Sequence, residues 1–99
     1  MLYMIMGQAA PESHERRARA RPDHLKRLAT LQDEGRLVLA GPLPAIDSPD
    51  PGPAGYAGGL IIAEFPSLSA ATTWAHDDPY VHADVYREIV IKPFVQALP

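Results

Sequence analysis

The sequence predicts an α+β fold of the ferredoxin-like class, a β-α-β-β-α-β sandwich with an antiparallel sheet. Two observations support this prediction. Four short apolar runs alternate with two stretches of helical spacing in that order, without internal repeats. The chain has 99 residues, which is enough for one compact domain and too few for a second. We therefore expect a single domain over residues 1–99.

The first strand and the first helix come from the N-terminal third of the chain. Leu2–Met6 is an apolar run typical of a strand, and a loop and a polar, arginine-rich stretch follow it. Pro22 suits the first position of a helix and Gly35 suits the position just after its end, so we expect this helix over about 22–34. His24 then lies in the opening turn, on the side that carries the leucines of the helix.

A segment rich in proline and glycine separates the two middle strands. We expect the second strand from Leu37 to about Leu43 and the third from about Leu60 to Phe65. Neither a helix nor a central strand accepts so many prolines, so residues 42–58 are predicted to form one long loop. Loops of this length are commonly lids or binding elements. We interpret this one as a lid; the competing interpretations are an irregular connection stiffened by its prolines and an arm that grips a partner subunit.

The C-terminal elements complete the sheet and leave one of its faces uncovered. Ser67 suits the N-cap of a helix that ends before Pro79, a short turn follows, and Val85–Val95 reads as the last strand. The strands are apolar on both faces, whereas two helices cover only one face of the sheet. A second copy packed sheet against sheet is the simplest cover, so we expect an obligate homodimer.

The chain directions in this topology bring several polar side chains to the same end of the sheet. A carboxylate that bonds one imidazole nitrogen fixes the tautomer and leaves the other nitrogen to accept a proton, so His24 and Asp78 form the candidate acid–base pair. At a helix start, the helix dipole disfavours the imidazolium while the carboxylate favours it. The candidate substrate-binding residues are Arg17, Arg21, Tyr80 and Pro42. The competing interpretation is that His24 only borders the core and that Asp78 only caps the short turn after it.

Composition excludes several other kinds of chemistry. The chain has no cysteine, which rules out thiolate nucleophiles, disulfides and cysteine-bound metals. Its net charge is −3 and no basic stripe runs along it, so nucleic-acid binding is not expected. The apolar N-terminal run is too short for a membrane span and lacks the features of a signal peptide, so we expect a cytoplasmic protein. No metal-ligand spacing occurs among the histidines, and neither a metal nor a cofactor is expected.

An ordered set of motifs runs through the whole chain. These motifs are Met1-Leu2-Tyr3, Arg21-Pro22-x-His24-Leu25, Asp33-Glu34-Gly35-Arg36-Leu37, Ala40-Gly41-Pro42, Ile62-Ala63-Glu64-Phe65, Asp78-Pro79-Tyr80 and Lys92-Pro93-Phe94. Together they resemble the YCII-related (YciI-like) family. The resemblance implies a ferredoxin-like dimeric α/β barrel, similar to muconolactone isomerase, with a His/Asp pair that maps onto His24 and Asp78. The chain departs from the family pattern at Gly58-Gly59, where many relatives carry a small hydroxyl residue.

The resemblance also implies a reaction class. Its best chemical precedent is elimination of HCl from a chlorinated hydroxyhydroquinone, and the related fold supports proton movement on lactones. We therefore expect a cofactor-independent lyase or isomerase, in which His24 moves a proton on a small oxygenated ring, Asp78 orients the imidazole and an arginine stabilises the enolate-like oxygen. Two alternatives remain open: a non-catalytic binding or regulatory module that uses the same pocket, and a cofactor-free oxygenase.

Overall fold

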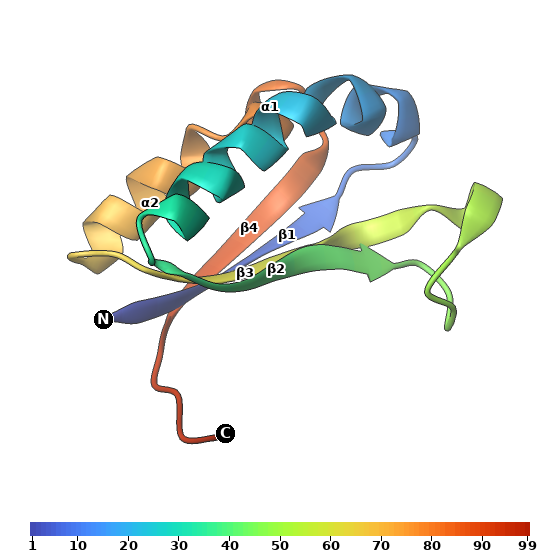
Figure 1. The fold of residues 1–99 in the computed structure, drawn as a ribbon. Coiled ribbons are helices and arrows are strands. Elements are labelled where there is room, and N and C mark those ends of the chain that lie inside the picture. The colour runs from blue at the N-terminus through green and yellow to red at the C-terminus, as the bar shows by residue number, and fades with distance from the viewer.

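In the computed structural model, which describes residues 1–99, helices cover one face of a four-stranded antiparallel sheet (Figure 1). The elements are β1 (Leu2–Ala9), α1 (His14–Asp33), β2 (Leu37–Pro44), a 3-10 turn (Gly52–Ala54), β3 (Tyr56–Glu64), α2 (Leu68–His76), α3 (Pro79–His82) and β4 (Tyr86–Phe94). The strand order is β2-β3-β1-β4. This order and the two covering helices confirm the ferredoxin-like α+β prediction. No helix combines the length and the apolar character that a membrane crossing requires.

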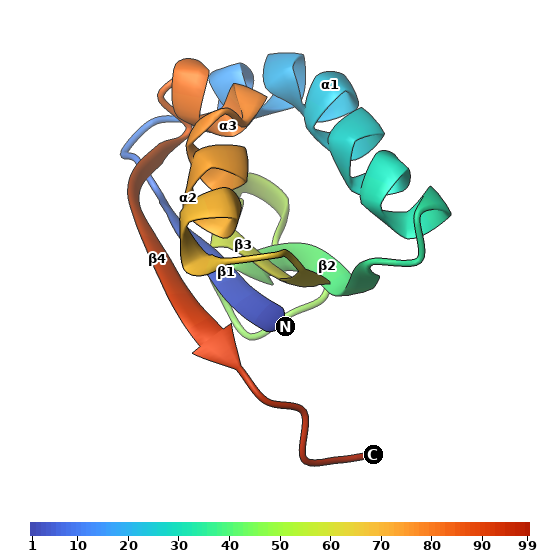
Figure 2. The same ribbon diagram turned by 90° about the vertical axis from the view of Figure 1, so that its left-hand side faces the viewer.

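The core lies between the sheet and the two longer helices. Side chains alternate along a strand, and Tyr3 and Ile5 of β1 point to the helices, as do Ile61 and Ala63 of β3. α1 lies over the β2 side of the sheet and adds Leu28 and Leu31, while α2 lies over the β4 side and adds two alanines (Figure 2). Burial of this apolar surface is the main term that holds α1 against the sheet.

The start of α1 differs from the prediction. The helix begins at His14, so the arginine-rich stretch expected to be irregular is helical, and Pro22 lies inside the helix instead of at its first position. The backbone carbonyl of Ser13 accepts the first helical bond from the amide of Arg17 at 2.8 Å. The side chain of Arg16 ties the first turn to the carbonyl of Asp84 at 2.9 Å. The long-range bond from Arg16 supports a helix start that local sequence does not signal.

The end of α1 follows the prediction. Gly35 has a φ of +71°, a left-handed conformation that glycine adopts without strain. Its amide bonds the carbonyl of Gln32 at 3.0 Å, and the amide of Arg36 bonds the carbonyl of Leu31 at 2.9 Å. This pattern is a Schellman motif, which satisfies carbonyls that a helix end otherwise leaves unpaired.

The middle loop is shorter than predicted. Pro42 and Pro44 belong to β2, and β3 already begins at Tyr56, so the irregular segment is 45–55 with the 3-10 turn inside it. β2 is an edge strand, where a proline costs nothing on the side that has no neighbour. The prolines therefore do not end the strand.

β1 runs on to Ala9, past the expected end at Met6, because Gly7 and Gln8 pair with both neighbouring strands. The start of α2 agrees with prediction: the Ser67 hydroxyl caps it by accepting the amide of Ala70 at 3.0 Å.

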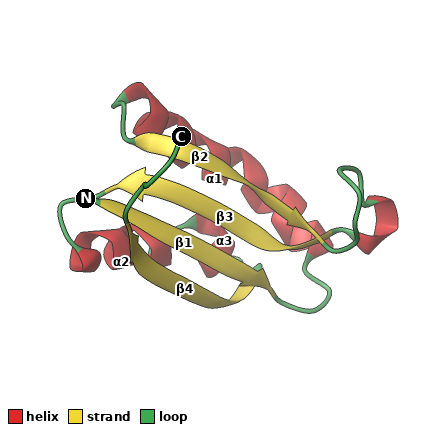
Figure 3. Ribbon diagram, turned by 90° about the horizontal axis from the view of Figure 1, so that it is seen from below, coloured by secondary structure: helices red, strands yellow, loops and turns green.

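The opposite face of the sheet carries no helix (Figure 3). Residues that alternate with the core positions point to this face, because successive side chains of a strand face opposite ways. The charged residues Glu64 and Lys92 also point to this face, and its apolar residues are Leu2, Met4, Met6, Leu39, Leu60, Ile62, Val90 and Phe94. Leu39 is 47% exposed. The sheet thus presents an uncovered apolar surface in the single chain.

Candidate active site

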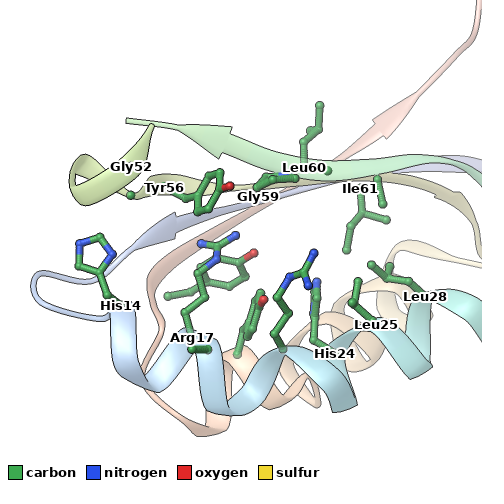
Figure 4. Close-up of a pocket in the computed structure, with 18 residues that line it drawn as sticks. His14, Arg17, His24, Leu25, Leu28, Gly52, Tyr56, Gly59, Leu60 and Ile61 are labelled. Carbon is green, nitrogen blue, oxygen red and sulfur yellow. The ribbon is translucent and has the colours of Figure 1, made fainter. Parts of the chain in front are cut away.

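A cavity of about 420 Å³ lies between α1 and the β2–β3 half of the sheet (Figure 4). Residues of α1, β2, β3, the middle loop, α3 and β4 line it. Half of the 18 lining residues are hydrophobic, tyrosines among them, and the rest are arginines, histidines, glycines and one proline. Its size and its mixture of apolar walls with a few polar groups are typical of a small-molecule site.

A buried histidine and a buried aspartate meet beside this cavity. Nδ1 of His24 lies 2.8 Å from Oδ1 of Asp78, and the two residues are only 8% and 4% exposed. Asp78 does not line the cavity, whereas His24 does. The hydrogen-bond network therefore assigns the proton to Nδ1, and Nε2 has no hydrogen-bond partner in the protein. The second ring nitrogen of His24 is therefore the one left to contact a ligand in the cavity.

The carboxylate of Asp78 is held ionised by its neighbours. Burial alone raises the pKa of Asp78, but the hydrogen bond and charge of His24, the backbone amide of Tyr80 and the charge of Arg27 outweigh it, so this pKa lies below its usual 3.8. Arg27 donates to Oδ2 at 3.0 Å and also to the carbonyl of Trp74 at 2.9 Å. Hydrogen bonds to both carboxylate oxygens therefore hold the Asp78 side chain in place.

Tyr80 forms one wall behind the imidazole. Its ring stacks on that of His24 with centroids 3.9 Å apart and planes 12° from parallel. Its backbone amide donates to the same Asp78 oxygen at 2.9 Å, because Asp78 caps α3 and Tyr80 is in its first turn. The Asp78 carboxylate therefore both caps α3 and contacts His24, so the two roles expected as alternatives occur together.

The predicted site residues come together, with one difference in their roles. His24, Arg17, Arg21, Tyr80 and Pro42 all line the cavity. Asp78 lies behind His24 instead. Arg21 is exposed and makes no hydrogen bond within the protein, whereas the Arg17 side chain is partly buried and donates to the carbonyl of Gly58 at 3.2 Å.

The position of His24 along its helix was predicted wrongly. His24 lies in the middle of the 20-residue α1 and not in its opening turn. The field of a helix terminus falls off within the first turn, so it does not act on this imidazole. Asp78, Tyr80 and the cavity wall set its environment.

Sequence reasoning missed several residues of the site. Tyr86, Tyr56 and His14 line the cavity, and Arg27 supports Asp78. Arg27 follows His24 by one helical turn, and that spacing is the signal that could have found it. The signal for Tyr86 is a pair of glycines, Gly7 of β1 and Gly59 of β3, which leave space for its side chain. No group of three or more histidine and carboxylate side chains lies close enough to hold a metal ion.

A model of the YCII-related domain matches residues 1–95. The chain belongs to the YCII-related family. This YCII-related protein is 56% identical over 94 residues to Protein YciI of Escherichia coli O6:H1, which covers 95% of this chain and 96% of that protein. An uncharacterized protein of Haemophilus influenzae is 49% identical over 94 residues, with the same 95% and 96% coverage.

Among solved structures, the YCII-related chain is similar to 5-chloro-2-hydroxyhydroquinone dehydrochlorinase from Burkholderia phenoliruptrix AC1100 in complex with 2,5-dihydroxybenzoquinone. The TM-score is 0.84 at 22% sequence identity, and the match covers 98% of this chain and 96% of that one. At this identity, the likeness shows a shared fold.

Proposed function

We propose that this YCII-related protein is a cofactor-independent acid–base enzyme, a lyase or an isomerase, that acts on a small oxygenated ring. The observation that carries the proposal is the His24–Asp78 pair: Nδ1 of the imidazole is engaged at 2.8 Å, and the imidazole lines a cavity of ring-binding size. The buried carboxylate of Asp78 keeps the imidazole in one tautomer and one orientation.

The reaction begins when Nε2 of His24 takes a proton from a carbon or a hydroxyl of the ring. The electron pair of that bond moves into the ring and leaves negative charge on a ring oxygen, near the cationic side chains of the lining. In an isomerase, the imidazolium returns its proton to another ring atom. In a dehydrochlorinase, the imidazolium returns its proton to the ring carbon that carries chlorine. Removal of a second hydroxyl proton then sends an electron pair through the ring to expel chloride, so that the sum is loss of HCl and formation of a quinone.

The dehydrochlorinase version is the one we propose to test first. The neighbour of the same fold is named for that reaction and holds an oxygenated ring, which makes its substrate class a reasonable first choice for this cavity. We also propose that the enzyme is a homodimer joined through the uncovered sheet face.

The test is turnover of 5-chloro-2-hydroxyhydroquinone, followed by chloride release and by the ultraviolet absorbance of the quinone formed. A wider set of hydroxylated and chlorinated quinols and of lactones extends the same assay. We expect His24→Ala and Asp78→Asn to lose activity by at least about 10²-fold, because general acid–base catalysis contributes that much or more. The matched controls are His82→Ala and Asp77→Asn, an exposed pair 3.3 Å apart on the outside of α3.

Full activity in His24→Ala would refute the proposal. Recovery of a stoichiometric ligand unchanged after long incubation, from a protein that turns over none of the ring compounds, would instead identify a binding module.

A further inference from the structure

The cavity contains two polar groups, Tyr86 and Arg17, that the proton transfer at His24 does not use. We infer that the Tyr86 hydroxyl and the Arg17 guanidinium together form a binding site for one ionised oxygen of the ring, so that the cavity selects phenolates and enolates over their neutral forms. This inference concerns the same cavity as the proposed function and extends it to a substrate class. Its test measures binding alone, so the two can fail separately.

A gap in the sheet surface positions Tyr86. Gly7 of β1 and Gly59 of β3 are directly paired in the sheet register. A Cβ on Gly7 would collide with the Tyr86 ring, and a Cβ on Gly59 would collide with its hydroxyl oxygen. The ring therefore lies across two strands, in space that only glycines leave open. The edge-to-face contact with Tyr80, with centroids 5.4 Å apart, fixes it from the other side.

The Tyr86 hydroxyl is a protonated donor without a partner. Burial raises the pKa of Tyr86 to about 12; the Arg17 cation opposes this rise, and Tyr80 and Asp78 add to it. The phenol therefore keeps its proton at neutral pH. The hydroxyl makes no hydrogen bond within the protein, yet it is not sealed off from the cavity that Tyr86 lines. A ligand oxygen is the acceptor that this arrangement lacks.

The Arg17 guanidinium has an unused donor beside the same wall. Its Nη2 donates to the carbonyl of Gly58, whereas its buried Nη1 has no partner at all. The guanidinium lies between the rings of Tyr56 and Tyr80, 5.1 Å and 5.0 Å from their centroids. Leaving a buried charged donor unpaired is costly, and an anionic oxygen removes that cost. Tyr56, one of these two rings, is only partly buried at the start of β3 and lines the cavity.

One side chain links these donors to the base. Tyr80 stacks on His24, lies under Arg17 and meets the edge of Tyr86. Base and donors therefore all contact the same aromatic residue beside one cavity. A proton removed at His24 leaves negative charge on the ring, and this pair of donors lies where a ring oxygen can carry that charge.

The test uses para-nitrophenol, whose ionised form alone is yellow, so that absorbance reports the protonation state of the bound ring. With wild-type protein we expect the bound probe to ionise at a lower pH than the free probe, because the phenolate binds more tightly than the phenol. Tyr86→Phe and Arg17→Gln should each weaken phenolate binding about tenfold or more and shrink that shift, since each removes a hydrogen bond to a charged group.

Two control variants remove similar groups elsewhere. Tyr3→Phe removes the hydroxyl of a tyrosine whose ring packs against Phe65 in the core. Arg19→Gln removes the charge of an exposed arginine of α1. Both should bind the probe as wild type does. Thermal melts of all variants show that each one folds.

The inference is overturned if wild-type protein does not bind the probe, if it binds phenol and phenolate equally, or if Tyr86→Phe leaves the shift intact. His24→Gln separates the two proposals. Retained phenolate selectivity in this variant supports the anion site whatever happens to turnover, while unchanged turnover would contradict the proposed function alone.

Discussion

At the scale of single residues, Asp78 has the greatest structural effect in the site. Its Oδ1 accepts from His24 and from the amide of Tyr80, and its Oδ2 accepts from Arg27. One carboxylate therefore joins the middle of α1 to the start of α3. Removing one member of a buried charged pair typically costs about 3–5 kcal/mol, because the remaining charge is left unpaired.

We expect Asp78→Ala to lower the free energy of unfolding by about 3 kcal/mol at neutral pH and Asp78→Asn, which keeps the cap acceptor, to lower it less. The pKa of Asp78 in the folded protein lies below 3.8, so its contribution is complete above that pH and is lost as the pH falls through the lowered value. Urea unfolding from neutral pH to below 3.8 should thus show a smaller acid loss in Asp78→Asn than in wild type. Equal acid losses would contradict this account.

Much of this site could be predicted from the sequence, and the reason differs from residue to residue. His24 was found because it continues the leucine row of α1, a pattern that survives a wrong helix start. Asp78 was found because the chain directions of the predicted topology bring the end of the second helix to the same end of the sheet as His24, and its cap role, expected as the alternative, is present as well. Tyr86 was missed because its position depends on Gly7 and Gly59, which become one slot only when their strands pair.

At the scale of elements, α1 and β2 show that local proline rules do not decide where a helix begins or where a strand ends. A proline inside a helix removes one hydrogen bond and crowds the preceding turn, so Pro22 was expected at a helix start. Tertiary ties from Arg16 and Arg17 instead support a helix that begins at His14. The prolines of β2 were likewise expected in a loop, because whether a strand lies at an edge depends on strand order and not on local sequence.

Pro22→Ala tests the cost of the proline within α1. Pro22 is exposed, and alanine restores an amide donor for the carbonyl of Ala18. We expect the free energy of unfolding to rise by about 1–2 kcal/mol, because the gain in helix propensity exceeds the entropy that the more flexible unfolded chain regains. The matched control is Pro79→Ala at the first position of α3, where a proline costs nothing and no gain is expected. Denaturant midpoints measure both, and equal midpoints for wild type and Pro22→Ala would contradict the argument.

At the scale of the whole molecule, the two faces of the sheet differ in whether helices cover them. α1 and α2 cover one face, and no helix covers the other (Figure 3), where the strand register places leucine, methionine, isoleucine and valine residues. Large apolar surfaces are uncommon on monomers, and this face is the basis of the proposed homodimer. The cavity lies on the helix side, so pairing through the uncovered face leaves its lining accessible.

Leu39 and Leu68 allow a controlled test of the homodimer, because both are 47% exposed and they belong to different surfaces. Leu39 pairs with Ile62 across β2 and β3 on the uncovered face, whereas Leu68 begins α2 on the helix side. We expect wild-type protein to sediment as a dimer and Leu39→Glu as a monomer or a much weaker dimer, because a charge buried at an apolar contact without a partner costs several kcal/mol. Leu68→Glu should remain dimeric. Sedimentation of wild-type protein as a monomer, or dissociation caused by Leu68→Glu and not by Leu39→Glu, would show that the uncovered face has another role.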